Sequence, residues 1–114
     1  MAVTVTTQNG NLDVGIYDFT SLKRLVSKGS TAVGAAGVQT IDIADTALGP
    51  GWYYLAFCCD SSTAVFRNSA VAAAICRACG FQQQSVGAVT LPDPMVPATY
   101  ATAVAPLICA SYST

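Results

Sequence analysis

Residues 3–17 read VTVTTQNGNLDVGIY, and apolar and polar side chains alternate through both halves of this stretch. In the second half the apolar positions are Leu12, Val14 and Ile16, each separated by one residue. A period of two is typical of strands that bury one face. The Asn-Gly pair at positions 9–10 favours a tight type I′ turn, because both central positions of that turn need positive φ. The sequence therefore predicts that the chain opens with a β-hairpin.

Further strand-like segments follow at intervals of roughly ten residues, separated by turn signals rich in Gly, Pro, Asp and Ser. They are residues 22–27, 38–43, 52–59, 64–67, 86–91 and 107–112. The proline-rich residues 92–97 must form a loop. This pattern predicts an all-β fold, an antiparallel two-sheet β-sandwich of jelly-roll-like form with at most one short helix. We expect it to form a single domain over residues 1–114.

The most apolar segment, WYYLAFCC at residues 52–59, does not alternate. A strand that is apolar on both faces is normally covered on both faces. We expect the protein core on one side and a helix or another subunit on the other.

Residues 69–79 are ambiguous between a short helix and a helical turn. Ser69 is suited to cap a helix and Gly80 to end it, and the alanine content favours the helical reading. The apolar stripe of such a helix would be Val71, Ala74, Ile75 and Ala78.

The composition is apolar and nearly uncharged. Hydrophobic residues make up 53% of the chain and charged residues only 10%, with a net charge of −1, whereas about a quarter of an ordinary soluble domain is charged. With so little charge, the electrostatic repulsion between copies of the protein is weak. This favours burial of their surfaces in an assembly. Nucleic acid is not expected as a partner, because the only basic residues are Lys23, Arg24, Lys28, Arg67 and Arg77. The first three of these are expected to be solvated.

Targeting signals are not found either. The N-terminus has no positively charged leader followed by an apolar core, and no apolar run reaches the roughly 18 residues needed to span a bilayer. We therefore expect a soluble product that is not secreted by the usual signal route, with no membrane partner.

The inventory of reactive side chains argues against an enzyme. The chain has no histidine and no glutamate, so the commonest general base and metal ligand are missing and no base activates its serines and threonines. Each aspartate lies in or beside a predicted turn or on the polar face of a strand, and we expect all of them to be turn-forming or solvated; they are Asp13, Asp18, Asp42, Asp45, Asp60 and Asp93. We expect no catalytic residue and no cofactor.

The five cysteines are odd in number, which is unusual for a secreted disulfide framework. Cys76 and Cys79 form a C-x-x-C, but Cys58 and Cys59 are adjacent and would point to opposite faces of a strand. These thiols are therefore not expected to bind a metal ion. We expect reduced thiols that are buried or partly buried.

The segments NLDVGIYD at residues 11–18, GVQTIDI at 37–43 and LGPGWYYLAF at 48–57 stand in this order with Gly-rich connections between them. Together they resemble a module of phage tail fibres and related virion structural proteins, over roughly residues 10–70. The resemblance implies a jelly-roll-like sandwich that assembles as a homo-oligomer, commonly a trimer, on a fibre, tail or capsid surface.

The expected function is thus a non-enzymatic structural role in a phage virion, as a capsid decoration or a tail or fibre accessory. The expected partners are further copies of the chain, with a trimer favoured, and other virion proteins such as those of the capsid or tail. The alternative is a carbohydrate- or receptor-binding module of a tail fibre, with a host surface glycan as its partner, because exposed tyrosines and Trp52 could stack on sugar rings. The expected interface residues are Trp52, Tyr54, Phe57, Val71, Ala74 and Ile75.

Overall fold

The structure of the protein is a computed structural model, which describes residues 1–84, 89–101 and 104–111. Of these residues 41% lie in strands and 6% in helix, so the fold is predominantly β and the all-β prediction is confirmed at this level. In chain order the elements are β1 (Ala2–Thr7), β2 (Asn11–Asp18), β3 (Arg24–Ser27), β4 (Thr31–Ala32), β5 (Gly37–Thr40), β6 (Tyr53–Cys59), β7 (Val65–Phe66), β8 (Asn68–Ala70), α1 (Ala73–Ala78), β9 (Val104–Pro106) and β10 (Ile108–Cys109).

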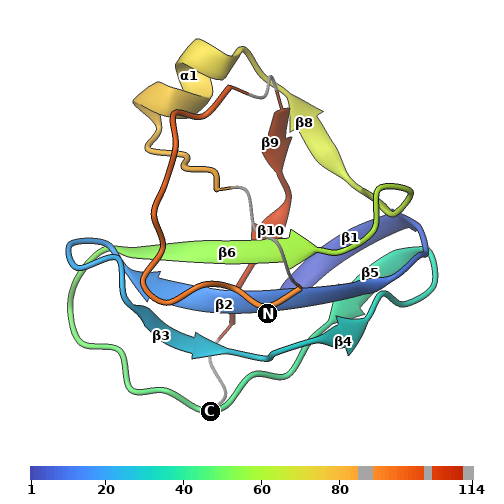
Figure 1. Cartoon of the computed structure of the whole chain (residues 1–114), viewed down its shortest axis with the longest axis horizontal. Coiled ribbons are helices and arrows are strands. Elements are labelled where there is room, and N and C mark those ends of the chain that lie inside the picture. Colours follow the sequence, from blue (N-terminus) through green and yellow to red (C-terminus); the bar gives the residue numbers. More distant parts are fainter. Residues whose placement is uncertain (85–88, 102–103, 112–114) are drawn as a thin grey trace.

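One sheet is built around β1. Strand β5 pairs antiparallel along one edge of β1, where Val5 is opposite Gly37. On the other edge β10 pairs with the first half of β1 and β7 with the second half, so that Val5 is also opposite Phe66. The first strand of the chain, β1, and the last described strand, β10, are therefore neighbours in one sheet (Figure 1).

The second sheet is built around β2. Strand β6 pairs antiparallel with β2 over its whole length, from Leu12 opposite Cys59 to Asp18 opposite Tyr53. On the other edge of β2 lie β3 and β4. In Figure 1, β6 and β2 cross the middle of the molecule, with α1 at one end and the long connection 44–51 at the other.

A single hydrophobic cluster joins the two sheets. The alternating apolar side chains of β1 and β2 are all buried in it, which is the outcome that their period of two predicts. Val33 and Ile41, from the connections that flank β4 and β5, complete it. Its buried members are Met1, Val3, Val5, Leu12, Val14, Ile16, Val33 and Ile41.

The prediction of an opening hairpin is wrong. β1 and β2 do not pair with each other, because they belong to different sheets. Gly10 has φ 66°, but Asn9 lacks the positive φ that a type I′ turn also requires. The carbonyl of Gly10 instead accepts a hydrogen bond from the N–H of Val33 at 3.0 Å. The apolar faces of β1 and β2 thus meet across the core, whereas a hairpin would set the strands side by side.

The predicted helix exists, but its start and its buried stripe differ from the prediction. α1 covers only residues 73–78, and Ser69 lies in β8 and caps nothing. Gly80 follows the helix with φ 79°, as expected for a glycine that ends it. The buried residue of the helix is Cys76, whereas Ile75 is 55% exposed. The stripe prediction failed because α1 turns Ala73 and Cys76 inward, which leaves Ala74, Ile75 and Ala78 exposed.

The remaining C-terminal predictions are met in part. Residues 92–97 form a loop, and the closing strand is the short β10. The predicted strand 86–91 is not found: residues 85–88 lie outside the described residues, and 89–91 are not in a strand. β9, which pairs with β8, was not predicted.

In the described part of the chain, no helix is both long and apolar enough to span a membrane.

Candidate functional site: the groove along strand β6

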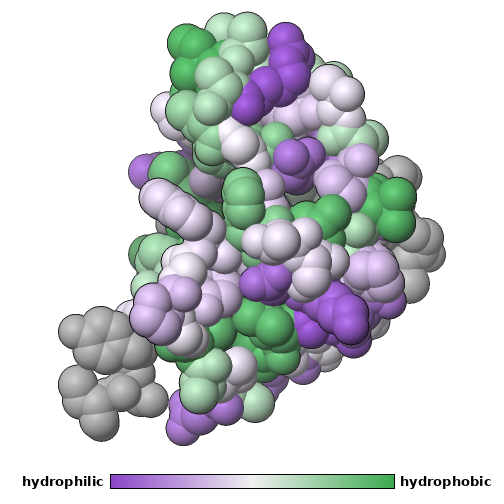
Figure 2. Space-filling model, turned by 90° about the vertical axis from the view of Figure 1, so that its left-hand side faces the viewer, coloured by the Kyte–Doolittle hydropathy of each residue, from purple (hydrophilic) through white to green (hydrophobic). Residues whose placement is uncertain are grey.

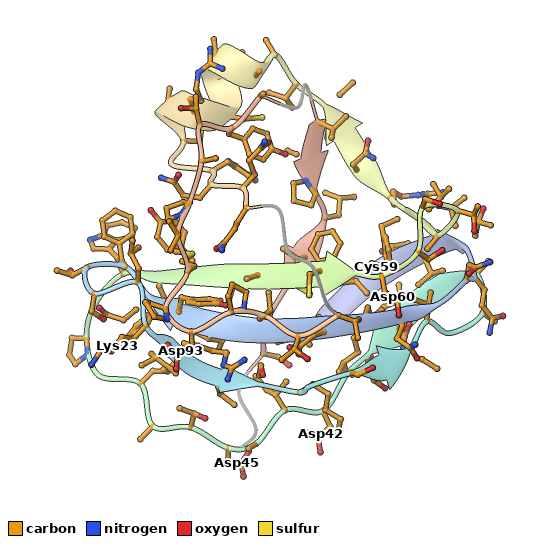
Figure 3. The ribbon with its side chains drawn as sticks, viewed as in Figure 1. Lys23, Asp42, Asp45, Cys59, Asp60 and Asp93 are labelled. Carbon is orange, nitrogen blue, oxygen red and sulfur yellow. The ribbon has the colours of Figure 1, made fainter. Side chains whose placement is uncertain are left out.

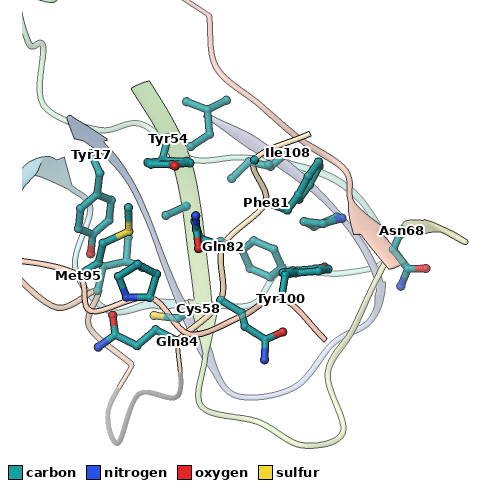
Figure 4. Close-up of a pocket in the computed structure, with 18 of the residues that line it drawn as sticks. Tyr17, Tyr54, Cys58, Asn68, Phe81, Gln82, Gln84, Met95, Tyr100 and Ile108 are labelled. Atoms are coloured by element: carbon teal, nitrogen blue, oxygen red, sulfur yellow. The ribbon is translucent and has the colours of Figure 1, made fainter. Parts of the chain in front are cut away.

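A groove with a cavity volume of about 770 Å³ lies beside β6. We call it the β6 groove. Both faces of β6 line it, with Leu55 and Phe57 from one face and Tyr54 and Cys58 from the other. Figure 4 shows Tyr17 and Met95 on one side of the β6 ribbon and Phe81 and Tyr100 on the other.

The wall on the Tyr17 side is the segment 91–97, which is fastened to the β2 sheet by hydrogen bonds. The buried carboxylate of Asp13 accepts one from the N–H of Leu91 at 2.9 Å, and the Tyr17 hydroxyl donates one to the carbonyl of Pro92. The Arg24 guanidinium donates to the Leu91 carbonyl. The N–H of Met95 donates to the carbonyl of Leu22 at 3.0 Å.

The opposite wall is the segment that follows α1. The carbonyl of Cys76 accepts a hydrogen bond from the N–H of Phe81 at 3.0 Å, which turns the chain out of the helix. The ring of Phe81 lies 5.8 Å from the ring of Tyr100, centroid to centroid. Arg77 holds this pair in place by donating to the Tyr100 carbonyl at 2.9 Å.

Three glutamines at 82–84 join the two walls. The N–H of Ala98 donates to the carbonyl of Gln83 at 2.7 Å, and the side-chain oxygen of Gln84 accepts from the N–H of Val96 at 2.7 Å. These neutral amides give the groove polar groups without charge. The groove thus joins segments that are far apart in sequence, such as those of Tyr17 and Pro92, 75 positions apart.

Near neutral pH the described lining of the groove carries a single charge. Burial raises the pKa of the Tyr17 phenol to about 12 and that of the Cys58 thiol to about 11, so both stay protonated. Among the described lining residues the one charged side chain is Arg67. In Figure 3, Asp42 and Asp45 project from the segment that follows β5, below β3 and β4. A groove of this kind suits an uncharged, apolar occupant.

Aromatic rings gather where the groove opens. The ring of Phe19 stacks on that of Tyr54, with centroids 5.0 Å apart and an interplanar angle of 25°. Trp52 precedes β6 and is 82% exposed, the highest exposure among the large hydrophobic residues described. On the face shown in Figure 2, hydrophobic residues also reach the surface at the end of the molecule that carries α1.

The structure brings together only half of the predicted interface residues. Trp52, Tyr54 and Phe57 all line the β6 groove, and the ring of Phe57 packs 5.3 Å from that of Phe66. The other three, Val71, Ala74 and Ile75, lie on or just before α1 and do not line it. The predictions missed Phe19, Phe81, Tyr100 and the segment 91–97, because only long-range contacts bring them to β6.

Two further expectations need correction. Asp13 is neither turn-forming nor solvated. Its side chain is 0% exposed, and one of its carboxylate oxygens accepts a hydrogen bond from the N–H of Gly29 at 2.8 Å. Arg24, expected to be solvated, is partly buried and bonded to Leu91. By contrast Asp18 is turn-forming and Asp60 is exposed, as predicted, and Asp60 accepts a hydrogen bond from the N–H of Asn11, 49 positions away.

The cysteines divide by exposure. Cys76 is buried and Cys58 and Cys59 are half-buried, as predicted, but Cys79 and Cys109 are exposed. These two lie at the end of α1 and on the short β10, where little packs over them. Within residues 1–84, 89–101 and 104–111, no three ligand-type side chains gather closely enough to hold a metal ion.

Comparison of the chain with models of known protein families, with curated proteins and with solved structures found no match.

Proposed function

We propose that this chain is a non-enzymatic structural protein of a phage virion that assembles with copies of itself through apolar β-sheet surfaces. The observation that carries the proposal is the β6 groove, which is apolar on both faces of one strand and opens beside the exposed Trp52. Apolar surface left in water costs roughly 25 cal/mol per Å², so covering the groove with a neighbouring subunit is favourable. We favour a capsid decoration or a tail or fibre accessory as the role.

We also propose that the two sheets are the halves of a jelly-roll-like sandwich. Inward-facing residues of β1 share one core with those of β2, as expected for two sheets packed face to face. Residues 3–5 of β1 alternate between buried and half-buried positions, whereas residues 12–17 of β2 are all buried. A sandwich of this type leaves its outer faces and its strand edges available for contacts between subunits.

The assignment to a phage virion rests on the resemblance of residues 11–18, 37–43 and 48–57 to the virion module. Residues 11–18 are β2, and residues 48–57 end in β6. Tyr17 from the first segment and Trp52 from the third both line the β6 groove. Two of the three segments that carry the resemblance therefore contribute side chains to the groove.

The absence of catalysis is part of the proposal. The sequence contains no histidine or glutamate, and a groove whose described lining carries only the charge of Arg67 has no pair of acid and base. Affinity for an apolar surface is the chemistry that such a groove supplies.

The test is the mass of the protein in solution, measured by light scattering after size exclusion. We expect a symmetric homo-oligomer, most favourably a trimer, at micromolar concentration. The Trp52→Ser variant should shift the mass towards the monomer, because it removes the largest exposed apolar side chain at the groove. The matched control is Val38→Ser, which removes an apolar side chain that is 72% exposed on β5, away from the groove, and should leave the mass unchanged.

The virion itself provides the second test. Imaging of the particle should place copies of the chain in contact with one another on the capsid or the tail. A stable monomer in solution whose copies do not touch in a virion would contradict the proposal.

A carbohydrate-binding module is the second candidate, favoured by one observation. Trp52 lies at the mouth of the groove together with the stacked rings of Phe19 and Tyr54, and aromatic rings of this kind stack on sugar faces. Binding to an array of surface glycans that is lost in Trp52→Ala but kept in Val38→Ala would favour this role. Assembly without any glycan binding would favour the structural role.

A further inference from the structure

Strand β6 uses only one of its two backbone edges. The N–H of Phe19 donates to the carbonyl of Trp52 at 3.2 Å, and the N–H of Asp60 donates to the carbonyl of Asn11 at 3.1 Å. In an antiparallel ladder the N–H and C=O of a residue point to the same edge, and successive residues point to opposite edges. The even-numbered residues from 52 to 60 therefore face β2, since the carbonyl of Trp52 and the N–H of Asp60 both do.

The odd-numbered residues of β6 turn their backbone to the outer edge. In the described part of the chain no other strand pairs with β6, and no hydrogen bond reaches the backbone N–H or C=O of Tyr53, Leu55 or Phe57. A row of unpaired donors and acceptors is a template for another strand. Here the row lies inside the β6 groove, because side chains from both faces of β6 line that groove.

We infer that the β6 groove receives an extended segment of a second copy of this chain, which pairs with the outer edge of β6 as an added strand. This inference rests on the proposed function of self-assembly and names the surface and the mode of contact. Strand addition draws its affinity from main-chain hydrogen bonds and its specificity from pockets for alternate side chains. The groove provides the hydrogen-bonding edge and apolar walls on both sides of it.

The size of the groove fits one strand. A strand of common length has about five or six residues and spans roughly 17–20 Å. β6 has 7 residues, so its outer edge can pair along such a segment. The two walls, 91–97 on one side and Phe81 with Tyr100 on the other, would contact the alternate side chains of the added strand.

The nearly uncharged lining of the groove favours an occupant that is itself poor in charged residues, as this chain is. An added strand would be buried on both faces, so it cannot carry several charges against walls whose described lining offers only the charge of Arg67. This chain has four stretches of more than twelve residues without Asp, Lys or Arg, at residues 29–41, 46–59, 78–92 and 94–114. A contact between a groove on one copy and a strand from the next is heterologous, and such contacts form a ring, of which a trimer is one, when the rotation between copies closes.

The test is amide hydrogen exchange of the full chain, read residue by residue by NMR in a dilute monomeric sample and in the assembled protein. In the monomer we expect the amides of Tyr53, Leu55 and Phe57 to exchange fast. Assembly should slow them by roughly tenfold or more, because pairing with the added strand buries them. The amides of Tyr54 and Ala56 are the internal control: they point to β2 and should be protected in both states.

A pair of variants at one position tests the backbone directly. Leu55→Pro removes the outward N–H, and proline is tolerated on an edge strand because that N–H is not needed within the chain. Leu55→Ala keeps the N–H and shortens a side chain that is 39% exposed. We expect Leu55→Pro to stay monomeric with an unchanged strand-type circular dichroism spectrum, and Leu55→Ala to assemble like the unaltered chain. If Leu55→Pro fails to fold, amide hydrogen exchange of the unaltered chain still tests the inference.

The outcomes separate this inference from the proposed function. If the amides of Tyr53, Leu55 and Phe57 still exchange fast in an oligomer, the copies contact each other through the faces of their sheets. The strand-addition inference would then be wrong, while the proposal of self-assembly would stand. A chain that stays monomeric at every concentration overturns both. A monomer that carries a small apolar molecule in the groove, detected by native mass spectrometry, also overturns the second copy as occupant.

Discussion

The carboxylate of Asp13, in the middle of β2, accepts a hydrogen bond from the backbone N–H of Leu91 at 2.9 Å, across 78 positions of sequence. Its other oxygen accepts from the N–H of Gly29 at 2.8 Å. One buried side chain therefore fastens two loops to the β2 sheet. The loop that begins at Leu91 forms one wall of the β6 groove, so Asp13 links the stability of the sheet to the shape of the site.

Removal of the Asp13 carboxylate should destabilise the protein strongly. Asp13→Ala leaves the N–H groups of Gly29 and Leu91 without an acceptor, and each buried unsatisfied donor costs about 1–3 kcal/mol. We expect the free energy of unfolding, measured by urea denaturation, to fall by about 2–5 kcal/mol. The control is Asp42→Ala at an exposed position, which should change it little. Equal stability of the two variants would mean that the hydrogen bonds of Asp13 make no net contribution to the free energy of unfolding.

Stability should fall at acid pH through two turn aspartates. Hydrogen bonds from Ser21 lower the pKa of Asp18 below its ordinary value of 3.8, and bonds from Asn11 lower that of Asp60. A carboxyl whose pKa is depressed by folding contributes stability that is fully present above the unfolded value of 3.8 and is lost as the pH falls through the lower folded value. Urea midpoints measured down through this range should decrease. In the double variant Asp18→Asn, Asp60→Asn the decrease should be smaller, and an unchanged acid slope would contradict the assignment.

The hydroxyl of Tyr17 should matter for both stability and alkaline behaviour. Tyr17→Phe loses the hydrogen bond to the Pro92 carbonyl, and we expect a cost of about 1 kcal/mol in urea denaturation. Tyr53→Phe, which loses an exposed bond to the Gly49 carbonyl, is the matched control and should cost less. Burial raises the pKa of Tyr17 from 10.0 to about 12, so the stability linked to its neutral form is present below pH 10.0 and is lost as the pH rises through 12. Absorbance titration should show one tyrosine that ionises last and that disappears in Tyr17→Phe.

Alkylation should distinguish the thiols. At mildly alkaline pH, iodoacetamide should modify the exposed Cys109 and Cys79 well before Cys58, because burial raises the pKa of the Cys58 thiol to about 11 and leaves little thiolate. Mass spectrometry of peptides taken over time gives the order. In denaturant all five thiols should react at similar rates. Modification of Cys58 as fast as Cys109 in the folded protein would show that the β2–β6 region opens readily.

The sequence alone determined the β-rich nature of this protein and one buried face of β1 and of β2, although the second face of β2, with Asp13 and Tyr17, is buried as well. Alternation in residues 3–5 and 12–16 predicts which side chains are buried, and the structure places all of these apolar side chains in the core. The unalternating segment 52–59 is the strand that lines the groove. The turn role of Asp18 also followed, since it depends on hydrogen bonds within the turn itself.

Only the tertiary structure decided which strands are neighbours. A period of two specifies the buried face of a strand, but the backbone groups that pair strands are the same for every residue type, so the sequence did not reveal that β1 and β2 lie in different sheets. The same holds for the free outer edge of β6, which no side-chain pattern marks. The burial of Asp13 depends on donors at Gly29 and Leu91, which are distant in sequence and reach it only when the loops fold over β2.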